Sequence, residues 1–134
     1  MGWYIDETPC DQDWEWADIL KAEARKEGMD LECGKNMGKY MRNAGLEVTH
    51  TKTYIWPWGT WLADTGHPET RRLGDLSLKT SSMFNGVIAR LLRGKSYSEE
   101  RIAELQSEAN QKLWGGQNMY IRWYVTVGRK PIYT

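Results

Sequence analysis

Apolar residues recur along this chain at two different periods, one typical of strands and one typical of helices. The segments 2–7 and 119–127 alternate apolar with polar residues, and the segment 47–56 is rich in aromatic and β-branched side chains. These patterns predict three strands. Between the first two strands, apolar residues at helical spacing predict helices over 13–27 and 35–44. The first half of the chain therefore reads as strand, helix, helix, strand.

The interval between the second and third strands predicts two more helices. Pro68 is typical of the first turn of a helix, and apolar positions continue at helical spacing as far as Leu92. A further helix starts after a capping serine, either Ser96 or Ser98, and its apolar stripe runs to Leu113. We therefore expect two helices before the last strand.

This order of elements predicts an α/β fold in a single domain that spans residues 1–134, because no repeat, linker or low-complexity segment divides the chain. Three strands make a narrow sheet with two open edges. We therefore expect the sheet to be completed by oligomerisation, and we expect the chain to be part of a larger fold.

The composition of the chain argues against several classes of function. The chain has 18 basic and 18 acidic residues, so it lacks the positive excess of a protein that binds nucleic acid. No apolar run approaches the roughly 18 residues of a membrane span, so no membrane partner is expected. Cys10 and Cys33 show neither disulfide nor zinc-ligand spacing. We expect a cytoplasmic or nuclear protein.

Four short motifs follow one another in a defined order along the chain. They are AGLEV at 44–48, Pro57 with Gly59 and Trp61, Leu73 with Gly74, and VGRKP at 127–131. In this order and spacing, essentially the whole chain resembles the C-terminal half of the fungal LaeA-like class I S-adenosylmethionine-dependent methyltransferases. The resemblance implies a Rossmann-like sheet with cap helices, in which the first strand here is the fifth of a parallel run. The last two strands would be the sixth and the antiparallel seventh.

The motif that binds the methyl donor in such folds is missing from this sequence. No glycine-rich loop follows a predicted strand, whereas the family places that loop after its first strand. We therefore expect no cofactor on the isolated chain, and S-adenosylmethionine only where a complementary half is supplied. The chain would then contribute the acceptor-side pocket of a split or truncated methyltransferase that acts on a small molecule.

Two other functions fit the same resemblance. A repurposed fold would bind a metabolite, or promote a cofactor-free rearrangement or cyclisation, as a homo-oligomer. A regulatory protein would instead form a hetero-oligomer with a full-length methyltransferase and carry out no catalysis. A split enzyme should gain cofactor binding from its partner, whereas a repurposed one should be a stable dimer that ignores the methyl donor.

The aromatic composition is the strongest sign of a binding site. The chain holds eight tryptophans, and three of them fall in the six-residue stretch WPWGTW at 56–61. The resemblance places this stretch near the mouth of the active site, where its rings would face a flat, apolar ligand. The alternative is that the rings only pack the core. The candidate substrate-binding residues are Tyr54, Trp56, Trp58, Trp61, Met83 and Asn85.

Three polar residues are candidates for catalysis. Asp6 and Glu7 follow the first strand, at the edge where open α/β sheets bind ligands, and either carboxylate could accept a proton from a substrate. The alternative is that they are solvated or cap a helix. His67 precedes the proposed cap helix at Pro68, and an imidazole titrates near neutrality. A histidine without a motif partner is, alternatively, structural or exposed.

Overall fold

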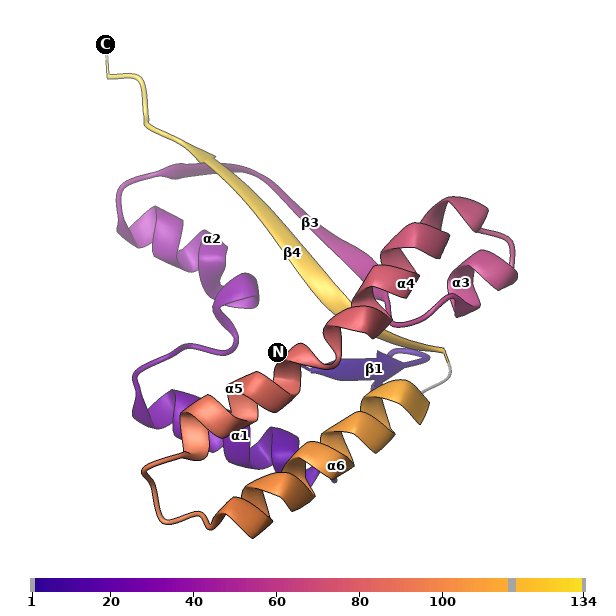
Figure 1. The fold of residues 1–134 in the computed structure, drawn as a ribbon. Helices are drawn as coiled ribbons and strands as arrows, with labels where there is room; N and C mark the ends of the chain where they lie inside the picture. The colour runs from indigo at the N-terminus through magenta and orange to yellow at the C-terminus, as the bar shows by residue number, and fades with distance from the viewer. Residues whose placement is uncertain (1, 116–117, 134) are drawn as a thin grey trace.

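The structure, a computed structural model, describes residues 2–115 and 118–133 and has a mixed α/β architecture (Figure 1). Its elements in chain order are β1 (Trp3–Ile5), β2 (Thr8–Pro9), α1 (Glu15–Lys26), α2 (Cys33–Asn43), β3 (Glu47–Pro57), α3 (Trp61–Asp64), the 3₁₀ helix η1 (Pro68–Thr70), α4 (Arg71–Thr80), α5 (Met83–Leu92), α6 (Glu99–Gly115) and β4 (Met119–Arg129). All three predicted strands are present, as β1, β3 and β4.

The sheet differs from the expected Rossmann-like arrangement. Its order is β2-β1-β4-β3, and every pair of neighbouring strands is antiparallel. A mixed α/β architecture is therefore present, but a Rossmann-like parallel sheet is not shown, because the strands that contact one another are antiparallel. The physical reason is that β4 inserts between β1 and β3 and runs opposite to both of them. As a consequence β1 and β3 run in the same direction, although they do not pair with each other.

The fourth strand, β2, was also not predicted. The chain reverses at Asp6 and Glu7, and Ile5 then pairs with Thr8 across a two-residue loop. Two-residue hairpin loops need a positive φ at their central residues, which usually calls for glycine or asparagine. Because Asp6 and Glu7 do not signal such a turn, the sequence pattern gave no indication of this hairpin.

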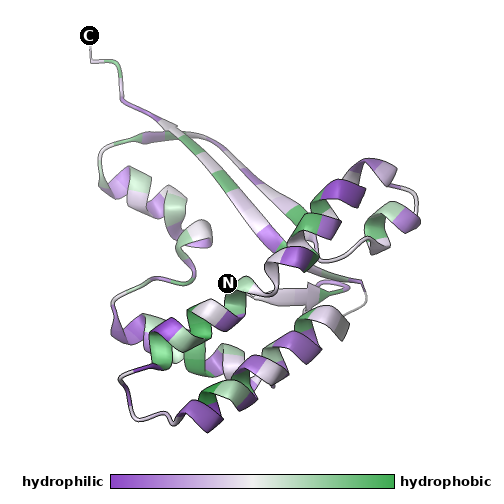
Figure 2. Ribbon diagram, in the orientation of Figure 1, coloured by the Kyte–Doolittle hydropathy of each residue, from purple (hydrophilic) through white to green (hydrophobic). Residues whose placement is uncertain are grey.

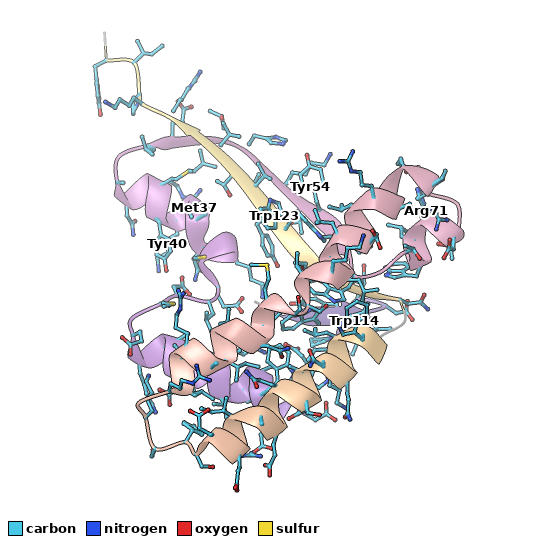
Figure 3. All side chains as sticks on the ribbon, in the orientation of Figure 1. Met37, Tyr40, Tyr54, Arg71, Trp114 and Trp123 are labelled. Carbon is cyan, nitrogen blue, oxygen red and sulfur yellow. The ribbon has the colours of Figure 1, made fainter. Side chains whose placement is uncertain are left out.

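The longest feature of the sheet is the ribbon formed by β3 and β4. It extends beyond the helical body towards the C-terminus, and α2 lies beside it (Figure 1). Tyr54 on β3 pairs directly with Trp123 on β4, so both rings lie on the same face of the ribbon (Figure 3). About half of each side chain is exposed, at 46% and 51%.

Three of the predicted helices are present with small changes in their ends. The helices expected over 13–27 and 35–44 are α1 and α2. For α6 the capping serine is Ser98 and not Ser96, because Ser98 Oγ accepts the backbone N–H of Arg101 at 3.1 Å. These ends were predictable because a cap depends on residues that are adjacent in sequence.

The apolar stripe that follows Pro68 is divided among η1, α4 and α5, which was not predicted. The chain breaks at Ser81, which is completely buried. Its hydroxyl accepts the indole N–H of Trp58 at 3.0 Å, so a polar contact from the exit of β3 holds the break in place. A hydrophobic pattern does not report such a contact, because the stripe keeps its helical spacing on both sides of the break.

The core lies where β1 meets α1, α5 and α6, and apolar residues gather where these three helices face one another (Figure 2). Trp3 is at its centre and only 1% of it is exposed. Four aromatic rings lie around it with centroids 5.4–6.1 Å away, those of Trp14, Trp16, Trp58 and Phe84. Tilted and edge-on contacts at these distances add to the burial energy of such large rings.

Candidate functional site

Several of the predicted site residues follow β1 or β3, and these residues lie at the same end of the sheet. Because these strands run in the same direction, their carboxyl ends lie at the same end of the sheet, beside the start of β4. Asp6 and Glu7 leave β1 there, and Trp58 and Trp61 leave β3 there. Open α/β sheets bind their ligands at this kind of edge.

The two acidic candidates sit in the hairpin loop with positive φ values, 47° for Asp6 and 65° for Glu7. Both side chains are exposed, and the backbone N–H of Glu7 donates to the hydroxyl of Tyr120 at 3.0 Å. Residues held in this left-handed conformation without glycine are found disproportionately at functional sites. The loop therefore presents two carboxylates to solvent from a fixed backbone.

Each of the three clustered tryptophans has a polar partner for its indole N–H. Trp56 donates to Ser77 Oγ, Trp58 to Ser81 Oγ at 3.0 Å, and Trp61 to the backbone carbonyl of Met119 at 2.8 Å. The ring of Trp56 also packs on Trp123, with 4.9 Å between centroids. These contacts fit the packing interpretation of the stretch, since they tie the exit of β3 to α4 and to β4.

Two of the predicted residues nevertheless line a common hollow. Trp58 forms part of its floor and Met83, which is 66% exposed, part of its rim. The hollow measures about 270 Å³ and its lining is almost wholly apolar. The remaining residues that line it are Trp3, Thr80, Phe84, Val87 and Ile121. Its chemistry suits an apolar group and offers no charged side chain.

The other candidates lie outside this hollow. Tyr54 is on the exposed ribbon, where the Lys52 ammonium lies 4.7 Å from its ring centroid. His67 is exposed and its Nδ1 lies 3.3 Å from the carboxylate of Glu69, so its partner is a local neighbour and not Asp6 or Glu7. Asn85 on α5 holds a buried Oδ1 that accepts no hydrogen bond from the described part of the chain.

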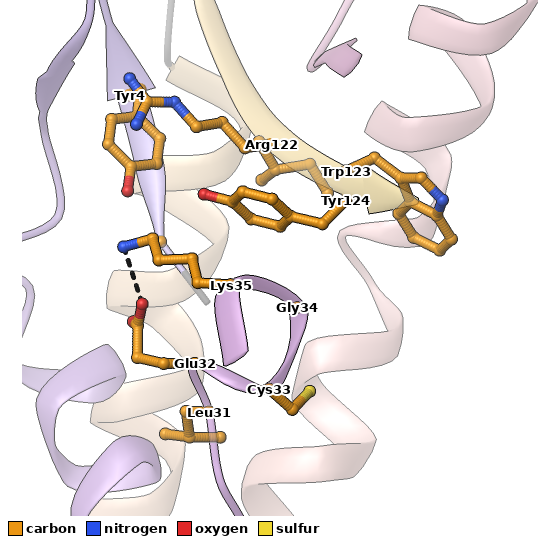
Figure 4. A pocket seen from close by; sticks show the side chains of 11 residues that line it. Tyr4, Leu31, Glu32, Cys33, Gly34, Lys35, Arg122, Trp123 and Tyr124 are labelled. Carbon is orange, nitrogen blue, oxygen red and sulfur yellow. Dashed lines mark ion pairs between the residues drawn. The ribbon is translucent and has the colours of Figure 1, made fainter. Parts of the chain in front are cut away.

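A second cavity was not predicted from the sequence, and Figure 4 shows it. It measures about 350 Å³ and lies between the start of β1, the middle of β4 and the first turn of α2. Gly34 lets α2 approach β4 closely, because a Cβ there would lie 2.7 Å from a ring carbon of Tyr124. Tyr4, Lys35 and Arg122 complete the polar part of its lining.

Two contacts of charged side chains, one ion pair and one cation–π contact, shape this cavity. The Lys35 ammonium lies 2.7 Å from the Glu32 carboxylate, and this contact lowers the pKa of Glu32 and raises the pKa of Lys35. The guanidinium of Arg122 lies over the ring of Tyr4, with its carbon 4.1 Å from the ring centroid. Such cation–π contacts are worth roughly 0.5–2 kcal/mol, depending on desolvation.

A sequence signal for this cavity existed in the last strand. Tyr120, Arg122 and Tyr124 alternate there with apolar residues, and alternate residues of a strand share one face. The pattern therefore placed a cation between two tyrosines on the face opposite the core. It could not indicate that Tyr4 and Lys35 would reach the same place, since both are distant in sequence.

Neither a metal centre nor a membrane span is found in the described ranges. Among residues 2–115 and 118–133, no group of three or more histidine, cysteine, aspartate or glutamate side chains could hold a metal ion. In the same ranges no helix combines the length and apolar character needed to cross a bilayer.

Comparison with models of known families, with curated proteins and with solved structures finds no match to this chain. These comparisons therefore give no support to the resemblance to LaeA-like methyltransferases, which depends on the sequence motifs alone.

Proposed function

We propose that this chain forms the acceptor-side portion of an S-adenosylmethionine-dependent methyltransferase that acts on a small molecule. One observation carries the proposal. The strands β1 and β3 run in the same direction, and the last strand, β4, runs opposite to them in the same sheet. The family resemblance assigns these directions to the fifth, sixth and seventh strands.

The rest of a parallel run would join the sheet at the outer edge of β1. Only the two-residue strand β2 covers that edge in the described structure, pairing with Tyr4 and Ile5. A short, weakly covered edge strand can accept a further strand. The cofactor-binding portion would come from another polypeptide or from a longer chain.

The acceptor would lie at the carboxyl ends of β1 and β3. The apolar hollow that Trp58 and Met83 line is the surface that would hold a flat ring. The carboxylates of Asp6 and Glu7 are exposed at the same end of the sheet, and either could take the proton that a hydroxyl or amine acceptor loses. The two reactants would be S-adenosylmethionine and the acceptor. Methyl transfer needs little more from the protein than to hold these two in line.

Calorimetric titration with S-adenosylmethionine tests this proposal. The chain alone should give no binding heat. Mixed with the N-terminal, cofactor-binding half of a LaeA-like methyltransferase, it should raise the affinity above that of the half alone. Tight binding of the donor by the isolated chain would contradict the missing-half argument, and so would a mixture that binds no better than the half does.

A second candidate is a cofactor-free, metabolite-binding homo-oligomer. The exposed aromatic pair Tyr54 and Trp123 on the β3–β4 ribbon favours it, because exposed aromatic surface often marks an interface. Sedimentation of the chain alone separates the two functions. A stable dimer that gives no heat with the methyl donor would support the second candidate, and a monomer would exclude it.

A further inference from the structure

The cavity of Figure 4 is lined by Tyr4, on the face of the sheet opposite to Trp3, whereas the apolar hollow of the proposed methyltransferase site is lined by Trp3. We propose that this cavity binds a planar organic monoanion, of the chemical class of aromatic carboxylates. The inference does not depend on the proposed function, because its charged and hydrogen-bonding side chains line this cavity alone, although Ile121 lines both.

The size and walls of the cavity suit a small aromatic compound. Its volume of about 350 Å³ is near the lower end of the range for ligand sites, roughly 300–1,000 Å³. Tyr4 and Tyr124 supply aromatic walls, and Leu31 and Ile121 add apolar surface. Such walls stack on a flat ring, whereas a bare inorganic anion would leave them without a contact.

The charges of the lining side chains favour an anion. Three of them are ionised, and Glu32 and Lys35 offset each other at 2.7 Å. Arg122 then leaves one positive charge, because no carboxylate in the described part of the chain forms an ion pair with it. A partly buried cation without an anionic partner favours a bound carboxylate, which matches its forked donors.

Further hydrogen-bond donors meet in the cavity beside the first turn of α2. Figure 4 shows the hydroxyls of Tyr4 and Tyr124 and the ammonium of Lys35 pointing towards one another. The Tyr4 hydroxyl makes no hydrogen bond within residues 2–115 and 118–133. A carboxylate accepts from such donors, whereas a neutral hydrocarbon of the same shape would offer the Tyr4 hydroxyl no acceptor in a partly desolvated place.

Calorimetric titration with 2-naphthoate, and with the neutral 2-naphthalenemethanol as the matched probe, tests the inference. The full chain should bind the carboxylate about tenfold or more tightly than the alcohol. Arg122→Gln should remove this preference. Arg129→Gln is the control, because Arg129 is on the same strand but pairs with Glu47 at 2.9 Å, outside the cavity, and should bind naphthoate as the unaltered chain does.

Two further measurements keep the inference open to refutation if Arg122→Gln folds poorly. Tyr4→Phe keeps the ring and removes only the hydroxyl, and it should weaken naphthoate binding several-fold. Cys33 is exposed and lines the cavity, so bound naphthoate should slow its alkylation by iodoacetamide. Equal binding of the acid and the alcohol, no binding at millimolar concentration, or an unchanged alkylation rate with naphthoate bound would each overturn the proposal.

Discussion

Trp61 donates its indole N–H to the backbone carbonyl of Met119 at 2.8 Å, and this bond joins the exit of β3 to the first residue of β4. The same carbonyl also accepts the backbone N–H of Trp58 at 2.8 Å. The two bonds fix the end of the sheet at which the candidate residues lie. An unusual density of tryptophans in an irregular stretch thus has a structural explanation, because each indole supplies a long reach and a polar end.

Trp61→Phe should lower the free energy of unfolding by about 0.5–1.5 kcal/mol, because a smaller aromatic ring remains but the indole donor is lost. The Met119 carbonyl keeps its bond from Trp58, so no buried acceptor is left unpaired. Urea unfolding measures the change. Trp114→Phe is the control, since Trp114 is 53% exposed, and it should leave the midpoint unchanged (Figure 3). Equal effects of the two substitutions would show that the Trp61 bond contributes nothing.

Trp3→Ala should be far more destabilising, by about 3–5 kcal/mol. Trp3 is 1% exposed and four aromatic rings surround it, so truncation would leave a large cavity that rigid neighbours fill poorly. Urea unfolding followed by circular dichroism measures this loss, with Trp114→Ala as the exposed counterpart. A loss below about 1 kcal/mol would mean that Trp3 is not the centre of the core.

Several elements of this fold, although not β2 or the division between α4 and α5, were predictable because their signals are local. The period of the apolar residues identified β1, β3 and β4 and the helices α1, α2 and α6. The sheet was not predictable in the same way, because the position of β4 between β1 and β3 depends on contacts between residues that are distant in sequence, such as Trp3 with Ile121. No local pattern encodes which strands become neighbours.

The candidate sites also differ in whether their residues are close together or far apart in the sequence. Trp58 and Met83 are two of the six substrate-binding candidates and line one hollow, whereas Tyr54 and His67 lie elsewhere, and the binding role itself stays a prediction. The cavity of Tyr4 and Arg122 was missed because its groups come from the first strand, the last strand and the start of α2. Only the polar alternation of the last strand could have been recognised in advance.

Glu7→Gly should raise the free energy of unfolding by about 1 kcal/mol. Glu7 holds a φ of 65°, which costs a residue with a Cβ roughly 1–2 kcal/mol, and glycine avoids most of this cost. Thermal unfolding measures the gain. Asp6→Asn is the matched control, since asparagine tolerates the same conformation, and it should change the midpoint little. A destabilised Glu7→Gly variant would mean that the side chain makes contacts worth more than the strain.

Two glycines on neighbouring helices should respond to alanine in opposite directions. A Cβ on Gly74 in α4 would lie 1.9 Å from the backbone oxygen of Gly59, so Gly74→Ala must displace the exit of β3. We expect a loss of about 1–3 kcal/mol from this overpacking. A Cβ on Gly86 in α5 meets nothing within 4 Å, so Gly86→Ala should stabilise the helix by up to about 1 kcal/mol. Urea unfolding of both variants checks the contrast, and a loss in both would contradict the packing described for α5.

The buried carboxylate of Glu23 should make stability depend on acid pH. It is 5% exposed and lies 2.7 Å from both the Lys26 and the Lys95 ammonium groups. Hydrogen bonds from the ammonium groups of Lys26 and Lys95 lower the pKa of Glu23 in the folded state, and the bond from Lys26 has the larger effect. The stabilisation is therefore complete above the unfolded pKa of about 4.3 and is lost as pH falls through the folded value.

Glu23→Gln tests this dependence, because it keeps the shape of the side chain and removes the charge that titrates. The urea midpoint of the unaltered chain should fall between about pH 5 and pH 3, and the variant should show a smaller fall over the same window. The control is Glu47→Gln, which removes a carboxylate whose pKa Arg129 lowers on the exposed ribbon, where ion pairs contribute little. If Glu23→Gln and Glu47→Gln flatten the pH profile equally, burial of Glu23 adds nothing to its coupling with Lys26 and Lys95, and the link between α1 and the loop before α6 is only a surface contact.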